Sequence, residues 1–527
     1  MELVQTAAPV LEGRGRPRGT PVLAITLIAA AAFAVEMAVS ARYGYHRDEL
    51  YFLVAGQHPA FGYVDQPPVT PLLARASAAV FGNSPEALRV LPALALAALV
   101  VITASMSRIL GAGRTGQLLA ALAAATCAEY LGALHLLTTT APDLVCWAVM
   151  LLLALRLLAS EDPRWWVAIG AVAGAGSEAK WNIGFLAVAL IAGLAMTRAR
   201  GLLASPWLLL GAAVAALLAA PDIAWQAAHG WPQLAVFRGL NQAAGHNRLV
   251  YWPAQVAYTG VALTPVWVTG LVWSMRSPHA RRFRPVGIAC ALTIVLQFIL
   301  GGKPYYPGAA FTFLFAAGAT AVERWLAHRG GQGSAQGPAQ GSERAPARVR
   351  ARVGPATLAA AAMLVSAAPA LPVALPVLPA RTLHTVPLQK INYDLAETIA
   401  WPRLVALVAR EYDSLPPSQR RRTTILTANY GEAGAIRRYG PAMGLPGAYS
   451  GANNFWLWGP PPAFDTAALA VNTDPAVLRA EFTRVRLIAT FHNGLGVRDD
   501  EEGARIYLAT GLRRPWAPAW PAFRDYS

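Results

Sequence analysis

Residues 43–71 read Y-G-Y-H-R-D-E-L-Y-F-L-V-A-G-Q-H-P-A-F-G-Y-V-D-Q-P-P-V-T-P. This stretch follows an apolar run at 21–40, which is long enough to cross a bilayer. It also concentrates three carboxylates, Asp48, Glu49 and Asp65, although only 14% of the residues in the chain are charged. A polar stretch of this kind at the end of an apolar run predicts the floor of a catalytic site at a membrane surface.

The composition places most of the chain in lipid. Of the 527 residues, 55% are hydrophobic, and the mean hydropathy of +0.39 is too high for an ordinary soluble protein. About eleven apolar stretches, all before Pro379, are long enough to span a bilayer. They are 21–40, 90–110, 117–137, 143–159, 165–180, 182–197, 205–222, 251–275, 286–301, 305–322 and 354–378. The predicted fold class is therefore a polytopic α-helical membrane protein.

The net charge of +16 predicts an orientation in the membrane and not a nucleic-acid partner, because the arginines fall between the apolar runs. With the N-terminus in the cytoplasm, every second connection is basic, as the positive-inside rule requires. Spans 165–180 and 182–197 could instead be one long helix, but the arginine cluster at 276–284 would then lie outside. We therefore predict a multi-pass protein of the cell membrane with a cytoplasmic N-terminus.

Composition also divides the chain into segments. They are a cytoplasmic tail at 1–20, a membrane core at 21–325 with an extracytoplasmic loop at 41–89, a disordered low-complexity linker at 326–353, a last span at 354–378 and an extracytoplasmic domain at 380–527. In the last segment, three strand-like runs (T-T-I-L-T-A-N-Y, A-L-A-V-N and V-R-L-I-A-T-F) alternate with helical ones. This alternation predicts a small α/β domain with a short parallel sheet.

The arrangement of the carboxylates suggests distinct tasks. Asp48 and Glu49 are adjacent, so on any regular backbone one can face a substrate while the other pairs with an arginine or caps a helix. Asp65 is followed by Pro67 and Pro68, which hold the preceding residues out of a helix. A single aspartate just outside a span can also be a simple helix cap or a solvated charge.

The pattern R-D-E-L-Y-F, followed by Gly62-Tyr63-Val64-Asp65-Gln66-Pro67-Pro68, resembles the first extracytoplasmic loop of the family 39 and related membrane glycosyltransferases. That group includes protein O-mannosyltransferases and the lipid A aminoarabinose transferase. The resemblance covers about residues 20–325 and leaves the C-terminal domain outside. It implies a GT-C fold, a multi-helix membrane architecture, and a sugar donor carried on polyprenyl phosphate.

The resemblance also implies a mechanism. In that family the aspartate of the D-E pair is the expected general base, which implies Asp48 here, with Glu49 beside it. A partly desolvated carboxylate suits the removal of a proton from an acceptor hydroxyl. The leaving group is a phosphate diester, which needs charge stabilisation more than protonation. A single displacement implies inversion at the anomeric carbon.

Lysines are the candidates for that stabilisation. Only three of the 44 basic residues are lysines, and two of them, Lys180 and Lys303, fall at predicted outer ends of spans. Lys303 lies in G-G-K-P-Y-Y-P, which also resembles a family segment near the donor phosphate. We predict phosphate contact for both, the alternative being lysines that snorkel to the interface. Tyr305 and Tyr306 either wall the lipid groove or belong to the aromatic belt.

Four more residues complete the predicted site. Asp143 opens the fourth span, where it is either a cap or the second acidic residue that lines the site in the family. Arg89 can pair with Glu86, with Glu49 or with the donor phosphate. His46 can line the cavity together with His58 and His135, and Tyr63 belongs to the Y-x-D-x-P-P motif.

The sequence predicts no metal or other cofactor, although it leaves undecided whether the protein uses a divalent cation. Cys127, Cys146 and Cys290 lie inside apolar runs with neither a metal-binding nor a disulfide spacing. A zinc site from His46, His58 and Asp65 is conceivable, but no recognised spacing supports it.

The expected partners are the polyprenyl-phosphate-linked donor, membrane lipids and an unknown acceptor. Trp456 and Trp458, in an aromatic segment at 449–462, can stack on a sugar or pack on the membrane surface.

Two rival functions remain. Glu36 and Glu129 lie within spans, where a carboxylate is costly and functional, so a transporter or flippase is the alternative to an enzyme. Against it, the sequence has no internal repeat and no matched pair of broken helices. A non-catalytic protein that only binds polyprenyl lipid is the third interpretation.

Overall fold

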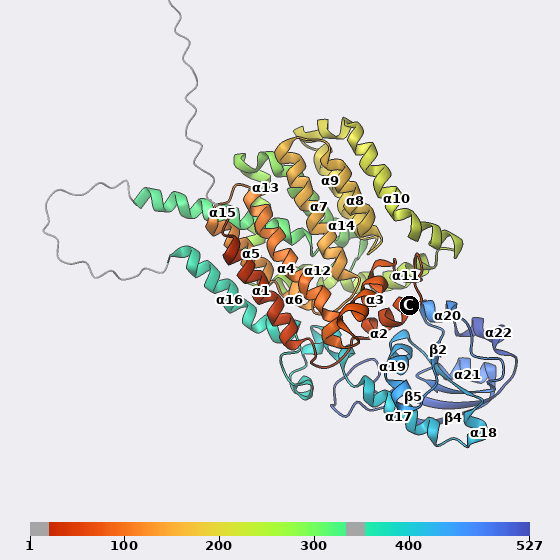
Figure 1. Cartoon of the computed structure of the whole chain (residues 1–527). Coiled ribbons are helices and arrows are strands. Elements are labelled where there is room, and N and C mark those ends of the chain that lie inside the picture. The colour runs from red at the N-terminus through yellow and green to blue at the C-terminus, as the bar shows by residue number, and fades with distance from the viewer. Residues whose placement is uncertain (1–19, 334–353, 527) are drawn as a thin grey trace, which may run out of the picture.

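Helices form most of the chain, and a small sheet-containing domain lies at one end of them (Figure 1). The computed structural model describes residues 20–333 and 354–526. The predicted tail (apart from Thr20) and residues 334–353 of the predicted linker lie outside this part of the chain. Residues 326–333, expected in the linker, instead continue helix α15 (Ala310–Gly333).

Six of the described helices are long and apolar enough to cross a membrane. They are α1 (Val22–Val39), α4 (Pro85–Ile109), α7 (Thr140–Ser160), α10 (Pro206–Ala228), the segment Pro278–Leu300 that ends in α14 (Arg284–Leu300), and α16 (Pro355–Ala374). Two bent pairs raise the number to eight if each is one span. The first joins α9 (Ile183–Ala195) to a 3-10 helix (Arg198–Ala204) at 118°, and the second joins Pro232–Thr259 to α13 (Thr264–Arg276) at 104°.

The expected number of eleven spans is therefore corrected to between six and eight by length and composition. Every predicted apolar stretch overlaps a helix, but several helices are short. The stretch at 117–137 breaks at Cys127, whose backbone is extended, into α5 (Arg114–Thr126) and α6 (Ala128–Ala133). The stretch at 165–180 is α8 (Trp165–Ser177), with only 13 residues. Apolar composition indicates burial in lipid or in a core but does not say where a helix breaks.

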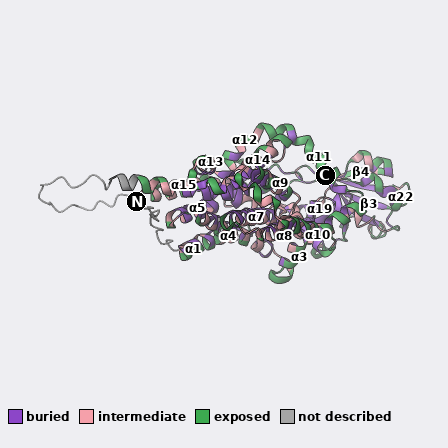
Figure 2. Cartoon of the chain, turned by 90° about the horizontal axis from the view of Figure 1, so that it is seen from above, coloured by how far each residue is buried: buried purple, intermediate pink, exposed green. Residues whose placement is uncertain are grey.

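Small residues let the helices of the bundle approach one another closely. A Cβ atom on Gly170 of α8 would collide with the carbonyl oxygen of Gly211 of α10. Glycine at such a crossing permits tight van der Waals packing between helices, which is the main force that joins them in a membrane. The buried residues gather along the middle of the bundle and in the sheet domain (Figure 2).

The predicted loop at 41–89 is largely helical. It contains α2 (Arg47–Gln57) and α3 (Val69–Phe81), joined by an extended segment that ends in Pro67 and Pro68. Helix α2 begins with a capping box. The carboxylate of Glu49 accepts a hydrogen bond from the backbone N–H of His46 at 2.9 Å. In return, the Nδ1 atom of His46 accepts a hydrogen bond from the backbone N–H of Asp48 at 3.2 Å. The polar residues of this stretch are thus held in a helix terminus with a fixed orientation.

The C-terminal domain has a mixed five-stranded sheet in the order β2-β1-β3-β5-β4. The strands are β1 (Thr423–Thr427), β2 (Ala448–Ser450), β3 (Ala467–Val471), β4 (Phe482–Thr490) and β5 (Arg505–Leu512). Strands β1 and β3, the first two of the predicted strands, are parallel as expected, and β2, which was not predicted, pairs parallel with β1. Strands β4 and β5 form an antiparallel pair that joins the sheet through β3. The expectation of an all-parallel sheet was wrong because β5, which the sequence reading missed, lies between β3 and β4.

One continuous apolar core joins the sheet domain to the bundle. It contains Leu50 and Phe52 of α2, Leu404 of α17 (Trp401–Asp413), Ile436 of α19 (Tyr430–Tyr439) and Leu469 of β3. Helix α19 packs so closely on α2 that a Cβ atom on its Gly434 would lie 2.9 Å from the backbone of Leu50. This shared core fixes the position of the C-terminal domain over the start of α2.

Candidate active site

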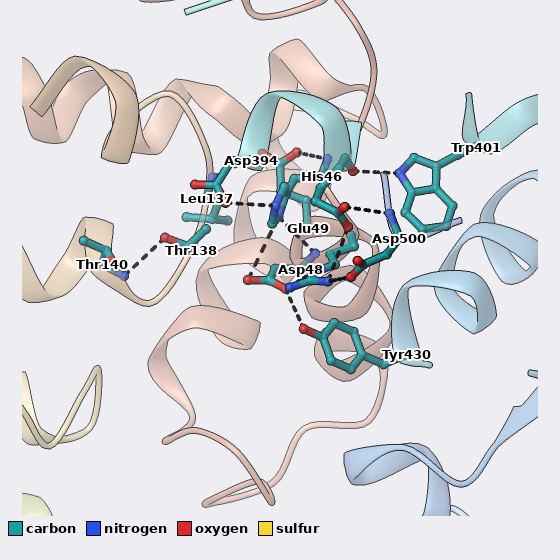
Figure 3. Close-up of polar contacts among 12 residues, drawn as sticks. His46, Asp48, Glu49, Leu137, Thr138, Thr140, Asp394, Trp401, Tyr430 and Asp500 are labelled. Carbon is teal, nitrogen blue, oxygen red and sulfur yellow. Dashed lines mark hydrogen bonds and ion pairs between the residues drawn. The ribbon is translucent and has the colours of Figure 1, made fainter. Parts of the chain in front are cut away.

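Asp48 lies in the first turn of α2 with its side chain 30% exposed. The hydroxyl of Tyr430, at the start of α19, donates a hydrogen bond of 2.9 Å to its Oδ1 atom (Figure 3). The Nδ1 atom of His46 lies 4.0 Å from the other carboxylate oxygen, and the Nε atom of Arg47 lies 3.8 Å from Oδ1. The carboxylate of Asp48 is therefore positioned by three neighbouring side chains and is still partly accessible to solvent.

Glu49 points the opposite way and is fully buried. Its carboxylate accepts two hydrogen bonds from Arg89 (2.8 and 3.1 Å) and one each from the backbone N–H groups of His46 (2.9 Å) and Leu137 (3.1 Å). The adjacent acids thus have the divergent orientations that their spacing predicts. In this geometry Glu49, which we expected to be catalytic, ties α2 to α4 and presents no open oxygen to a substrate.

Arg89 of α4 is only 2% exposed and pairs with Glu49, one of the three partners that the sequence allowed. Its remaining donors reach the backbone oxygens of Ser40 and Gly44, both at 2.6 Å. Its Nη1 atom also lies 3.3 Å from His135, whose other ring nitrogen lies 3.0 Å from Glu36. The guanidinium thus joins the end of α1 to α2 and α4 and does not reach toward a donor phosphate.

Acidic side chains of the C-terminal domain contact the first turn of α2. The Nε2 atom of buried His46 lies 3.6 Å from Asp394, which belongs to a 3-10 helix (Tyr393–Thr398). Arg47 contacts Asp500 at 2.7 Å and Glu397 at 3.3 Å. Burial lowers the pKa of His46, but the charges of Asp394, Asp48 and Glu49 outweigh burial and raise this pKa above its ordinary value.

The residues from the C-terminal domain were missed in the sequence reading of the site. They are Asp394, Tyr430 and Asp500, which Figure 3 labels, and Glu397. The N-Y-G-E-A motif that contains Tyr430 stands out in the sequence, but nothing in it indicates α2 as its partner. Asn429 caps α19 there, so the motif also has a local structural task.

A second group of predicted residues gathers around the turn between α14 and α15. The Nζ atom of Lys180 lies 4.8 Å from the ring centroid of Tyr306 and 5.5 Å from that of Tyr305. Lys303 approaches Tyr305 at 5.9 Å. Buried Asp143, at the start of α7, is connected to the turn that carries the tyrosines through the side chain of Asn182. The structure thus brings all five residues together from three separate connections.

Asn182 is a further residue of this group that the sequence did not indicate. Its amide nitrogen lies 3.4 Å from Asp143 and donates to the backbone oxygen of Tyr306 at 3.1 Å, and its Oδ1 atom accepts from Gln297 at 2.9 Å. Asn182 therefore fixes the turn that carries the two tyrosines relative to Asp143.

The two groups are linked electrostatically through Tyr305. Burial is the main cause that raises the pKa of the Tyr305 hydroxyl, and the negative charges of Asp394, Asp48 and Asp143 raise it further. The ammonium group of Lys303 lies against the ring of the same tyrosine. Tyr305 therefore lies beside the lysines and within electrostatic reach of the half-buried carboxylate on α2.

Asp65 and Tyr63 belong to the extended segment that follows α2, and Asp65 contacts Tyr51, one turn of α2 after Asp48. The hydroxyl of Tyr51 donates a hydrogen bond of 2.9 Å to Asp65, and burial raises the pKa of Asp65 to about 7 against the opposing effect of that hydrogen bond. The ring of Tyr51 packs 4.9 Å from that of Tyr430, the hydrogen-bond partner of Asp48, so the two acids are linked through this pair of tyrosines. Tyr63 is buried, and its hydroxyl donates to the backbone oxygens of Ala55 and His58, which is a structural task.

The aromatic segment at 449–462 packs on the protein. Trp458 stacks on His58 with ring centroids 4.6 Å apart, and the indole N–H of Trp456 donates to the backbone oxygen of Trp520. Within the described residues, no group of three or more His, Cys, Asp or Glu side chains is arranged to hold a metal ion.

Comparison with known proteins gives a family-model match over part of the chain and a shared fold. Residues 65–225 match the family described as dolichyl-phosphate-mannose-protein mannosyltransferase. The structure is similar to that of ArnT from Cupriavidus metallidurans bound to undecaprenyl phosphate, with 16% sequence identity, a TM-score of 0.56, and coverage of 93% of this chain and 98% of that one. The apo state of the same ArnT gives 16% identity, a TM-score of 0.53, and coverage of 93% and 97%. No curated protein matches the sequence.

The likeness to ArnT reaches beyond the part of the chain for which the sequence suggested a resemblance. A match that covers 93% of this chain cannot end at residue 325 and includes much of the C-terminal domain. The fold is thus shared over a longer part of the chain than the motifs that carry the sequence resemblance.

Proposed function

Because the chain has the GT-C fold of membrane glycosyltransferases, we propose that it transfers a hexosyl or pentosyl group from a polyprenyl-phosphate donor to an extracytoplasmic acceptor. Asp48 is the general base, and the anomeric carbon is inverted. The observation that carries the proposal is Asp48, a partly accessible carboxylate that Tyr430 orients at 2.9 Å, in a structure that also gathers Lys180 and Lys303 against Tyr305. In the corresponding topology the N-terminus is cytoplasmic and the C-terminal domain lies outside.

The proposed reaction is a single displacement. The acceptor oxygen forms a bond to C1 of the sugar while the bond between C1 and the phosphate oxygen breaks. The proton of the acceptor hydroxyl moves to Asp48, and polyprenyl phosphate leaves with the bonding electrons. Positioning of the base by Tyr430 and His46 supports this role, because a carboxylate must reach the acceptor proton at hydrogen-bond distance.

The two lysines are proposed to bind the donor phosphate. Negative charge develops on the bridging phosphate oxygen as the sugar leaves, and nearby ammonium groups stabilise it. Asp143 and Asn182 are proposed to hold Lys180 and the tyrosine turn in place, which is supported by their mutual contacts. Tyr305 and Tyr306 provide faces that orient the ammonium groups through cation–π contacts.

A carrier of polyprenyl-linked or small substrates is the second candidate, and one observation favours it. Glu129 is buried in the bundle, and neither of its carboxylate oxygens has a hydrogen-bond partner among the described residues. Buried acids in membrane proteins often bind a coupled ion. The other acid that suggested a carrier, Glu36, is paired with His135.

Reconstitution distinguishes these functions. The purified chain in proteoliposomes is supplied with radiolabelled polyprenyl-phosphate sugars and a membrane extract as a source of acceptors. We expect the label to move from the donor lipid to an acceptor. Movement of the intact labelled lipid between leaflets without transfer would identify a carrier, and stable donor binding with neither event would identify a lipid-binding protein.

A further inference from the structure

A cavity lies at the opposite end of the bundle from the candidate active site. Its volume is about 620 Å³, and it is formed by the start of α1, the end of α4, the end of α7 and the starts of α5 and α8. Arg89 lies near the start of α4 in the site described above, whereas Arg108 lines this cavity 19 residues later in the same helix. At 1.5 Å per helical residue the two ends are separated by about 28 Å.

The cavity is lined by two arginines and by uncharged groups. Arg108 projects from α4 and Arg156 from α7, and no acidic residue is among the described residues that line the space. Hydroxyl and amide groups complete the polar part of the lining, namely Thr20, Thr26, Ser105, Ser160 and Gln117. Ser105, Ser160 and Gln117 already donate to backbone oxygens of nearby residues, so the two arginines provide the excess of positive charge.

The charge of the two arginines is not neutralised by the protein. Within residues 20–333 and 354–526 neither guanidinium forms an ion pair. The guanidinium carbon of Arg156 lies 5.5 Å from the ring centroid of Trp165, a contact that holds the side chain in position and leaves its positive charge unpaired. Helices α5 and α8 also begin at this end, and their N-termini add partial positive charge.

The cavity also has an apolar wall that faces outward. Val22 of α1 is 64% exposed and Val101 of α4 is 44% exposed, and both line the space. These helices are long and apolar enough to span a membrane, so in a bilayer their exposed apolar faces would contact acyl chains. A ligand that fills the cavity therefore meets two cationic side chains and an apolar wall in the same space.

We propose that this cavity binds the phosphodiester headgroup of an anionic glycerophospholipid. Arg108 and Arg156 pair with the phosphate oxygens, since the planar guanidinium group can donate two parallel hydrogen bonds to a phosphate. The acyl chains lie along Val22 and Val101. Basic pockets between membrane helices are suited to such headgroups, and a soluble anion would make no use of the apolar wall.

The experiment compares lipids on the full-length chain in detergent. Phosphatidylglycerol or phosphatidylcholine is titrated against the purified protein, and bound lipid is counted by native mass spectrometry while the melting temperature is followed. We expect phosphatidylglycerol to bind more tightly and to raise the melting temperature more. The double variant R108Q/R156Q should weaken phosphatidylglycerol binding by roughly fivefold for each arginine removed.

Two matched variants control for charge and for folding. R164Q/R276Q removes the same charge from arginines that do not line the cavity, and it should keep the lipid preference. R108K/R156K keeps the charge in the cavity and should retain most of the preference, so it reports on the proposal even if R108Q/R156Q unfolds. Equal binding of the two lipids by the unaltered chain would overturn the proposal, as would an undiminished preference in R108Q/R156Q. Equal protection by inorganic phosphate would also overturn it, because the occupant would then be a soluble anion.

Discussion

The hydroxyl of Tyr430 donates a hydrogen bond of 2.9 Å to Asp48, although the two residues are 382 positions apart in the chain. One belongs to the C-terminal sheet domain and the other to the first turn of α2. His46 and Arg47, the two residues directly before Asp48, contact Asp394 and Asp500 of the C-terminal domain, respectively. Asp48, the accessible acid of the candidate site, is thus held in place by the C-terminal domain, which contributes no helix to the apolar bundle.

Replacing Asp48 with Asn should abolish transfer while leaving membrane insertion and donor binding intact. An amide cannot accept the acceptor proton, and a positioned general base contributes about 10²- to 10⁴-fold to the rate. The rate is measured with labelled donor in proteoliposomes. The control is Asp413→Asn, at an exposed surface pair. Turnover near the original level in Asp48→Asn would remove this residue from the mechanism.

Tyr430→Phe should lower kcat by roughly tenfold and leave the donor KM nearly unchanged. The variant loses one hydrogen bond to a charged group, which is worth about 1.5 kcal/mol or more, and keeps the ring packing. Tyr439→Phe, at the other end of α19, is the matched control. A loss of kcat that is equal in both variants would point to a general weakening of α19, and unchanged kcat in Tyr430→Phe would refute a positioning role.

Substitution of Lys303 or Lys180 by Ala should reduce kcat on the order of 100-fold, because the phosphate charge that develops as the sugar leaves would lose a stabilising group. Lys390 is the third lysine of the chain, is exposed, and serves as the control. Steady-state kinetics over a range of donor concentrations separate binding from turnover. If Lys303→Ala behaves like Lys390→Ala, Lys303 is an interfacial lysine and does not contact the donor.

Arg89→Gln should destabilise the folded protein by about 3–5 kcal/mol, because it leaves the buried charge of Glu49 without its partner. The double variant E49Q/R89Q should be less destabilised than the sum of the single changes. Thermal unfolding in detergent measures both. Glu161→Gln removes the partner of exposed Arg282 and should cost less than about 1 kcal/mol. Equal effects at the two pairs would mean that the buried pair is not structural.

The stability of the protein should fall as the pH rises from about 4 to 7, in part because of Asp65. Burial raises the pKa of this acid from its ordinary value of 3.8 to about 7, so in this range the folded state binds more protons than the unfolded state. Asp65→Asn should remove this part of the pH dependence and increase the melting temperature at pH 8 relative to the unaltered chain. Melting curves between pH 4 and 8 test the sign, and a steeper pH dependence in the variant would contradict it.

Much of the bundle follows from the sequence alone. Every apolar stretch that predicted a span overlaps a helix, since helical hydrogen bonds are local and apolar side chains determine which segments leave water. The divergent tasks of Asp48 and Glu49 follow from their adjacency, and the β1–β3 parallel pairing follows from the alternation of strands and helices. These features depend on residues close together in the chain.

Only the tertiary structure decided which of the acids stays accessible and what surrounds it. The break at Cys127, the insertion of β5 into the sheet and the placement of Asp394 and Tyr430 against α2 all depend on contacts between distant segments. The burial of Glu49 likewise requires Arg89 from another helix. Such contacts arise when whole surfaces pack together, and no local pattern of residue types encodes which two surfaces will meet.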